Sequence, residues 1–155
     1  RNHPDLRFHV VGRSPTPEVL ALQGPRVVVT GTVPDIRPYL RHARVVVAPL
    51  RLARGIQNKV LEAMAMAAPV VAARTCVQAL ELSVGDGVWA AESAQSYVQQ
   101  IERLLADEDL ARGGGLDARA CVVRRFSWEA HLSVLDEDLG PLLGSNTHRA
   151  VVPVT

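Results

Sequence analysis

Short apolar runs recur along the first half of the chain, and they are continuous rather than alternating with polar residues. Four of them, LRFHVVG, RVVVTG, RVVVAPL and PVVAA, occupy residues 6–12, 26–31, 44–50 and 69–73. Strands that are apolar on both faces are typical of a parallel sheet between layers of helices. The pattern therefore predicts four such strands, and VWAA at residues 88–91 predicts a short last one.

Helix-compatible stretches separate these runs. TPEVLALQ has Thr16 as a cap with proline after it, PDIRPYLRHA has Asp35 before a short helix, and QNKVLEAMAMA consists largely of good helix formers. Strands that alternate with helices imply right-handed crossovers and a doubly wound α/β sheet with helices on both faces.

The last third of the chain is predicted to be helical. SAQSYVQQIERLLADE at residues 93–108 starts with Ser93 as a cap and places Tyr97, Ile101, Leu104 and Leu105 on one apolar stripe. Helical residues continue beyond it, but Gly113, Gly114 and Gly115 predict a hinge between two helices.

A further helix is expected in FSWEAHLSVLDEDLGPLL, with Ser127 as its cap, and the tail beyond it has no periodicity. We expect one domain over residues 1–143 and a loose tail over 144–155. Because the chain opens on Arg1 rather than Met, we also expect it to be a piece of a longer protein.

Composition excludes several classes of function. A net charge of +1 and scattered arginines give no track for a nucleic-acid backbone. No apolar run approaches the roughly 20 residues of a membrane-spanning helix, so we expect a cytoplasmic protein, with peripheral association at the inner face of the membrane as an open alternative. Cys76 and Cys121 suit two buried thiols in a reducing compartment, and no histidine, cysteine or carboxylate spacing predicts a metal site or a cofactor.

Lysine occurs once in the chain, at Lys59, alongside sixteen arginines. It lies just beyond the predicted strand 44–50, in the helix that also carries Glu62, and Gly55 precedes that helix. Ligands of open parallel sheets bind at the carboxyl ends of strands, where helix starts favour anions. A mobile ammonium for diphosphate and a carboxylate for sugar hydroxyls, one turn apart, predict a site for a sugar linked to a diphosphate.

The alternative is that Lys59 and Glu62 form an ordinary surface ion pair, worth a few tenths of a kcal/mol. Two other loops are candidates for the same edge of the sheet. Gly12 ends the first predicted strand and Arg13 could reach a phosphate, or the loop is a plain turn with a solvated arginine. GTVPD could offer backbone groups to a base from Val33 onward.

Several segments resemble one family when taken in order: VVGRSP, VVVTGTVPDIRPYLRHARVVVAPL, RGIQNKVLEAMAMAAPVVAA, VGDGVWA and FSWEAHLSVLD. They resemble the C-terminal domain of the retaining GT-B glycosyltransferases of family 4, group 1. The stretch around residues 44–73 is most similar to sugar transferases associated with exosortase and exopolysaccharide clusters in bacteria. The resemblance implies a Rossmann-like domain that binds a UDP- or GDP-sugar and faces an acceptor domain across a cleft.

The resemblance assigns roles to particular positions. Lys59 matches a lysine that binds diphosphate, and Glu62 matches a glutamate that accepts hydrogen bonds from the donor ribose. Gly12 matches the glycine loop, and Val33 the backbone that meets the base. One position departs from the pattern: Arg54 stands where many relatives have a glutamate close to the donor sugar.

At this position we expect Arg54 to contact phosphate. We expect Gly55 and its neighbour Ile56 to make the contacts with the donor sugar that the glutamate makes in relatives. The resemblance also implies that the first strand of the domain and the acceptor domain are absent from this chain. We therefore expect residues 6–12 and 44–50 either to pair with each other or to cause self-association.

The sequence thus predicts the donor-binding half of a retaining glycosyltransferase, inactive by itself, that serves bacterial exopolysaccharide or cell-surface glycan synthesis. No metal and no cofactor beyond the nucleotide-sugar donor are expected. Two alternatives stay open. One is half of a GT-B-type sugar-nucleotide epimerase, which would need acid and base groups that this chain does not show. The other is a non-catalytic α/β interaction module.

Overall fold

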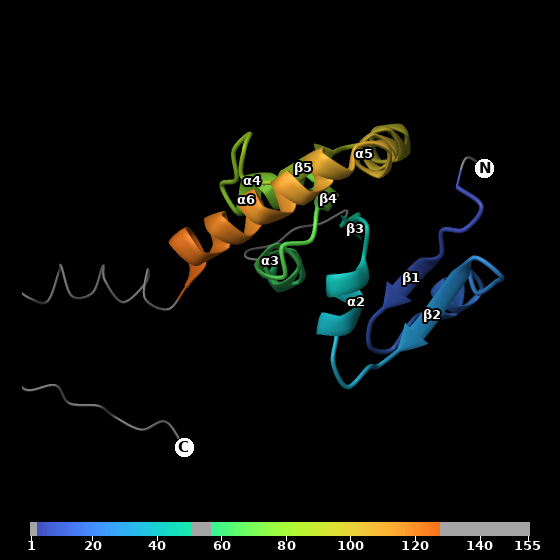
Figure 1. The fold of residues 1–155 in the computed structure, drawn as a ribbon. Helices are drawn as coiled ribbons and strands as arrows, with labels where there is room; N and C mark the ends of the chain where they lie inside the picture. The colour runs from blue at the N-terminus through green and yellow to red at the C-terminus, as the bar shows by residue number, and fades with distance from the viewer. Residues whose placement is uncertain (1–2, 51–56, 128–155) are drawn as a thin grey trace, which may run out of the picture. The chain divides into compact units, whose positions relative to one another are not determined.

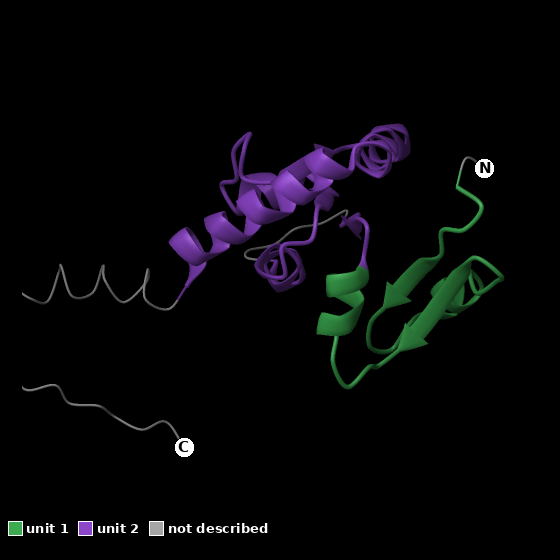
Figure 2. Ribbon diagram, viewed as in Figure 1, with its two compact units in different colours: residues 1–42 green, residues 43–155 purple. Residues whose placement is uncertain are grey.

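The computed structural model describes residues 3–50 and 57–127 (Figure 1). The chain divides into two compact units, residues 1–42 and 43–155 (Figure 2). Within the described residues, every pairing between named strands is parallel.

Unit 1 is a pair of strands with two short helices. Its elements are β1 (Phe8–Val11), α1 (Pro17–Leu20), β2 (Val27–Gly31) and α2 (Arg37–His42). β1 pairs with β2, so that Phe8 lies opposite Val27. The Asp35 carboxylate accepts a hydrogen bond from the backbone N–H of Arg37 at 2.9 Å, as expected of a residue that precedes a helix. Thr16 is at the N-cap position of α1 but makes no side-chain cap.

Unit 2 contains a three-stranded sheet and four described helices. Its elements are β3 (Val46–Ala48), α3 (Asn58–Ala65), β4 (Val70–Ala73), α4 (Arg74–Ala79), β5 (Val88–Ala91), α5 (Ala94–Ala106) and α6 (Glu108–Phe126). The strand order is β3-β4-β5. All five predicted strands form within the ranges expected, and the predicted α/β fold with parallel strands and helices on both sides is confirmed. The helix α4 was not predicted.

The described strands pair within each unit. β1 is hydrogen-bonded to β2 in one sheet, and β3 to β4 and β4 to β5 in the other, so each of these pairs joins strands that are consecutive along the chain. The expectation that residues 6–12 and 44–50 either pair with each other or cause self-association stays a prediction.

The core of unit 2 confirms three of the four residues of the predicted apolar stripe of α5, and Leu105 is half-buried outside the core cluster. Leu104 is buried in a cluster with Val71 of β4 and Ala91 of β5, and Tyr97 and Ile101 pack against it. α5 starts with the predicted cap. The hydroxyl of Ser93 accepts a hydrogen bond from the N–H of Ser96, and the hydroxyl of Ser96 accepts one from the N–H of Ser93. The buried stripe and the capped start therefore both stabilise α5.

The predicted glycine hinge is wrong, because α6 runs without a break from Glu108 to Phe126. Gly114 and Gly115 are buried at a close crossing. A Cβ at Gly114 would overlap the Trp89 ring of β5, and a Cβ at Gly115 would overlap the carbonyl of Ala67, just before β4. The glycines thus allow α6 to contact its neighbours closely, because they have no side chains, and they do not bend the helix.

The crossing places α6 at the amino ends of the strands. Gly87, which precedes β5, lies so close to α6 that a Cβ there would overlap the carbonyl of Gly114. Gly87 has φ +72°, a backbone conformation that glycine adopts without strain. α3 also packs against α6, as Figure 1 shows. The carboxyl ends of β4 and β5 are therefore at the opposite edge of the sheet.

Arginines from other elements bind the last carbonyls of three helices. Arg119 donates to the carbonyl of Ala65 at the end of α3 at 2.8 Å. Arg125 donates to the carbonyls of Leu80 and Glu81, just past α4, at 3.3 and 2.9 Å. These carbonyls have no partners within their own helices, and cations near helix ends also interact favourably with the helix dipole.

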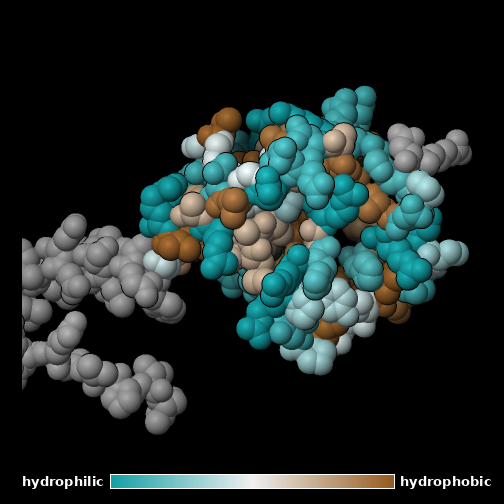
Figure 3. Space-filling view, viewed as in Figure 1, coloured by the Kyte–Doolittle hydropathy of each residue, from teal (hydrophilic) through white to brown (hydrophobic). Residues whose placement is uncertain are grey.

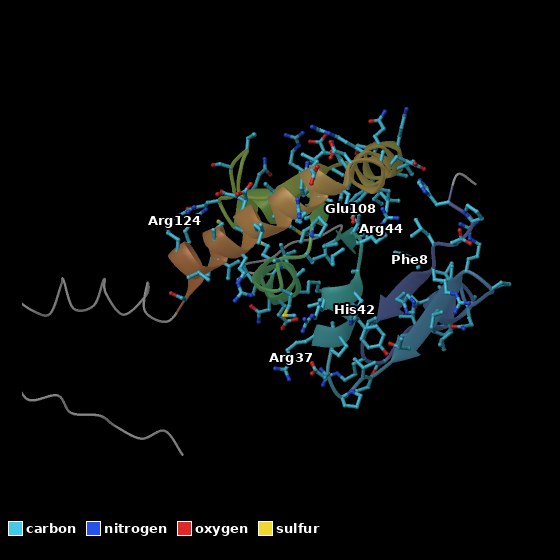
Figure 4. All side chains as sticks on the ribbon, viewed as in Figure 1. Phe8, Arg37, His42, Arg44, Glu108 and Arg124 are labelled. Atoms are coloured by element: carbon cyan, nitrogen blue, oxygen red, sulfur yellow. The ribbon has the colours of Figure 1, made fainter. Side chains whose placement is uncertain are left out.

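The third helix with an end carbonyl bound by an arginine is α5. Arg44, which precedes β3 and is labelled in Figure 4, donates to the carbonyl of Leu105 at 3.2 Å. The charges of α6 follow the same rule, because acidic Glu108 lies in its first turn and basic Arg124 in its last, as Figure 4 shows. Several arginines of this chain therefore have structural roles.

Exposed apolar side chains are spread over both units. On the face shown in Figure 3, hydrophobic residues are interspersed with hydrophilic ones. The larger exposed ones include Phe8, Leu20, Leu22, Leu116 and Val123. Scattered apolar residues of this kind are normal on protein surfaces.

We predict opposite effects for two neighbouring glycine substitutions in α6. Gly115→Ala should lower the free energy of unfolding by about 1–3 kcal/mol, because the new methyl group meets a backbone carbonyl. Gly113→Ala should raise it by roughly 0.5–1 kcal/mol, because no atom lies within 4 Å of its Cβ position and alanine favours the helix. Urea denaturation measures both. Equal stability of the two variants would contradict the close crossing.

Candidate functional site

A pocket lies in unit 2, where β3, β4 and β5 end. Its volume is about 470 Å³. It is lined by Pro49 and Leu50 after β3, by Ala73, Arg74, Thr75 and Gln78 around the start of α4, by Ala91 and Glu92 at the end of β5, and by Tyr97 of α5. Because the strands are parallel, their carboxyl ends meet at this edge, which is where open α/β sheets bind ligands.

α3 presents Lys59 and Glu62 on its exposed side. Both residues are exposed, whereas Val60, Ala63 and Met64 of the same helix are buried. In the described part of the chain, no ion pair joins Lys59 to Glu62 or to another carboxylate. The alternative of an ordinary surface pair is therefore not what the structure contains.

Lys59 lies in the first turn of α3, the helix that leads from β3 back to β4. A helix that connects two parallel strands starts at their carboxyl edge, so Lys59 belongs to the edge that carries the pocket. Burial raises the pKa of the Cys76 thiol in α4, and the positive charge of Lys59 acts on it in the opposite direction, in keeping with that placement.

Tyr97 connects α5 to the same region. Its hydroxyl donates a hydrogen bond to the carbonyl of Ala48, the last residue of β3, at 3.2 Å. Burial raises the pKa of Tyr97, and the neighbouring Cys76 thiol adds to the shift. The hydroxyl thus stays protonated at neutral pH and holds α5 against the tip of β3.

The start of α3 differs from the starts of the two long helices. Ser93 caps α5 and Asp107 caps α6, each accepting a backbone N–H with its side chain. The N-cap residue of α3 is Gln57, and its side chain makes no cap hydrogen bond. The first N–H groups of a helix have no acceptors within the helix, so an anion is favoured at such a start.

Other predicted site residues lie in unit 1. Gly12 follows β1 and donates its N–H to the carbonyl of Gly31 at 3.3 Å. Arg13 is exposed, and Val33 follows β2 and is half-buried. Because β1 and β2 are parallel, these residues belong to the carboxyl edge of that sheet.

The structure brings Lys59 and Glu62 together on one helix, and Gly12, Arg13 and Val33 to one edge of a sheet. Arg54, Gly55 and Ile56, the remaining predicted site residues, lie outside the described residues.

The pocket residues Arg74, Gln78 and Glu92 were not predicted. Arg74 and Glu92 directly follow the apolar runs 69–73 and 88–91. Lys59 was indicated by the rule that polar residues after a parallel strand lie at the edge where ligands bind. The same rule would have indicated Arg74 and Glu92. Tyr97 was assigned only to the apolar stripe of α5, because its hydroxyl contributes nothing to the periodicity.

No group of three or more histidine, cysteine, aspartate or glutamate side chains in residues 3–50 and 57–127 is arranged to hold a metal ion. The helices described there also include none with the length and apolarity needed to span a bilayer.

Comparison with known proteins gives one family and a consistent set of structures. The sequence profile of the family described as "Glycosyl transferases group 1" matches residues 1–107. The lipopolysaccharide core biosynthesis mannosyltransferase LpcC of Rhizobium leguminosarum bv. viciae is 32% identical over 123 residues, which cover 78% of this chain and 35% of that protein. The chain thus spans about a third of the length of this relative.

Two solved structures illustrate the shared fold. Anabaena Alr3699/HepE, crystallised in complex with UDP, has a TM-score of 0.73 and 19% identity, covering 92% of this chain and 42% of its own. Sucrose-phosphate synthase from Thermosynechococcus elongatus has a TM-score of 0.74 and 24% identity, covering 94% of this chain and 40% of its own. At these identities the likeness shows the fold, the Rossmann-like α/β fold of GT-B glycosyltransferases.

We predict that neither cysteine of the native protein reacts readily with a thiol reagent. Cys76 and Cys121 are both buried, and burial raises the pKa of each thiol, so the reactive thiolate is disfavoured. Spectrophotometric titration with DTNB should show slow labelling at pH 8 and rapid labelling of both thiols in guanidinium chloride. Rapid labelling of Cys76 in the native protein would contradict its burial in α4.

Proposed function

Because the chain belongs to the group 1 glycosyltransferases, we propose that it is the donor-binding half of an enzyme that transfers a sugar from a nucleotide-diphosphate sugar with retention. The observation that carries the proposal is the placement of Lys59. Its ammonium has no carboxylate partner among the described residues, and Lys59 lies in the first turn of α3, at the carboxyl edge of the sheet of unit 2. That is the edge at which open α/β sheets hold phosphorylated ligands.

In the proposed mechanism the diphosphate is the leaving group. The bond between the anomeric carbon of the sugar and the diphosphate oxygen breaks, and negative charge builds up on that oxygen. Lys59 and the first N–H groups of α3 would stabilise this charge as a preorganised set of donors. Glu62, one turn along the helix, would accept hydrogen bonds from the ribose hydroxyls.

For Gly12, Arg13 and Val33 of unit 1 we propose contacts with the nucleotide, with the glycine loop and Arg13 at phosphate and the Val33 backbone at the base. Arg54, Gly55 and Ile56 would contribute contacts to the phosphate and the donor sugar. The acceptor would bind to another part of the full-length protein, and the chain by itself would transfer nothing. We expect no metal and no further cofactor to be required.

The relatives support the biological setting of the proposal. A mannosyltransferase of lipopolysaccharide core synthesis is among them, which fits a hexosyl transfer to a bacterial surface glycan or exopolysaccharide. A structural neighbour was crystallised with UDP, which fits a nucleotide-diphosphate donor. Membership of family 4, an association with exosortase gene clusters and a cytoplasmic site of action belong to the same proposal.

We predict that Lys59→Ala weakens the binding of UDP or GDP to the full-length protein by about 10- to 100-fold, the loss expected for one charge-assisted hydrogen bond to phosphate. Glu62→Gln should weaken it less, about 3- to 10-fold, because its neutral amide accepts ribose hydroxyls more weakly. Isothermal titration calorimetry measures both dissociation constants.

Arg112→Ala is the matched control for loss of a cation. Arg112 is exposed on α6 and pairs with Asp109, so its removal should leave nucleotide binding unchanged. Unchanged binding by both the Lys59 and Glu62 variants would refute the site. A full-length protein that binds neither nucleotide would instead favour the non-catalytic module.

A further inference from the structure

We propose that the pocket of about 470 Å³ at the tips of β3, β4 and β5 receives the sugar ring of the donor, and that it selects an uncharged sugar. The inference rests on the proposed function, because it takes the diphosphate to lie at Lys59. It adds the part of the site that binds the sugar and discriminates between sugars. This role is assigned to Gln78, Thr75 and the pair Arg74 and Glu92.

Position is the first argument. Thr75 and Gln78 line the pocket from α4, which follows β4, and Lys59 lies in the first turn of α3, which leads from β3 back to β4. The pocket and Lys59 therefore belong to the same carboxyl edge of the sheet. The sugar of a nucleotide-diphosphate donor is bonded directly to the terminal phosphate. A phosphate held by Lys59 consequently leaves its sugar at the edge where the pocket lies.

The lining of the pocket is the second argument. Sugar rings present hydroxyl groups at their rim and C–H groups on their faces. The pocket offers an amide at Gln78, a hydroxyl at Thr75, and apolar surface at Leu50, Ala91 and the Tyr97 ring. The Gln78 amide makes no side-chain hydrogen bond to the described residues, so its donors and its acceptor are available to a ligand. The volume also falls within the range of about 300–1,000 Å³ that small-molecule sites occupy.

The charge of the pocket is the third argument, and it fixes the class of sugar. Arg74 and Glu92 form an ion pair at the rim, with side chains 56% and 62% exposed. Each charge is neutralised by the other, so the lining carries no net charge. A hexuronic acid would need an unpaired cation there, and an amino sugar with a free ammonium would need an unpaired carboxylate. The lining thus favours a neutral hexose.

Calorimetry on the full-length protein tests the sugar-binding role. The probes are UDP, GDP and their hexose conjugates UDP-glucose and GDP-mannose, of which the better-binding pair is used. Gln78→Ala should leave the dissociation constant of the free diphosphate within about twofold and weaken the nucleotide sugar about 3- to 10-fold, since one or two hydrogen bonds to the sugar are lost. Gln99→Ala, which removes an exposed amide of α5 outside the pocket, should change neither constant.

A charge variant tests the sugar class. Glu92→Gln leaves Arg74 without its partner, so the ratio of affinities for UDP-glucuronic acid and UDP-glucose should rise several-fold in favour of the acid. Both Gln78 and Glu92 are exposed, so the variants should keep the wild-type melting temperature.

The outcomes separate the two proposals. If wild-type protein binds the free diphosphate but Gln78→Ala and Glu92→Gln change no affinity ratio, the sugar pocket is refuted and the donor site at Lys59 stands. If Gln78→Ala weakens the free diphosphate as much as its sugar conjugate, the pocket holds phosphate and not sugar, and the inference is wrong. If wild-type protein binds no nucleoside diphosphate, the proposed function fails and this inference fails with it.

Discussion

The close crossing of α6 over the rest of unit 2 is the constraint on which this structure depends. At Gly114 and Gly115 the helix has no side chains, and the Trp89 ring and the Ala67 carbonyl occupy the space that a Cβ would need. Interiors packed at this density tolerate little change in volume. The crossing therefore determines where α6 lies, which is against the segments that lead into β4 and β5. As a consequence the opposite edge of the sheet, where these strands end, is left to loops, helix starts and the pocket.

Arginine and lysine divide the cationic roles in the described part of this chain. Arg125 reaches two successive carbonyls with one planar guanidinium, a geometry that the single ammonium of lysine cannot reproduce. Arg119 and Arg44 each donate to one helix-end carbonyl. Lys59 makes no such bond and is exposed on α3. The rigid guanidinium of arginine suits a permanent structural contact, whereas the compact and mobile ammonium of lysine suits a ligand that must bind and be released.

Much of the fold could be predicted from the sequence, because the signals were local. Continuous apolar runs gave all five strands, and Ser93 gave the start of α5. The glycines of α6 were misread because their role depends on a contact with Trp89, about 25 residues away in the chain, which no local pattern reveals. α4 was missed because its start has no capping side chain and RTCVQA contains several weak helix formers, whereas Pro17 and Asp35 indicated the equally short α1 and α2. For the site, Lys59 was identified by its uniqueness, whereas the pocket residue Gln78 has no distinguishing spacing.

The crossing and the arginines together bear on the candidate site. α3 carries Lys59 near its start and α4 carries Gln78, and the two helices are separate segments that could shift against each other. Arg119 and Arg125, six residues apart on α6, bind the carbonyl ends of α3 and α4 respectively. One rigid helix thus sets the spacing of two others from the side opposite the pocket. Electrostatic stabilisation of a leaving group requires donors that are already in place before the charge develops. On the proposed function, α6 would therefore support the chemistry without touching the donor, by holding α3 and α4 at a fixed spacing.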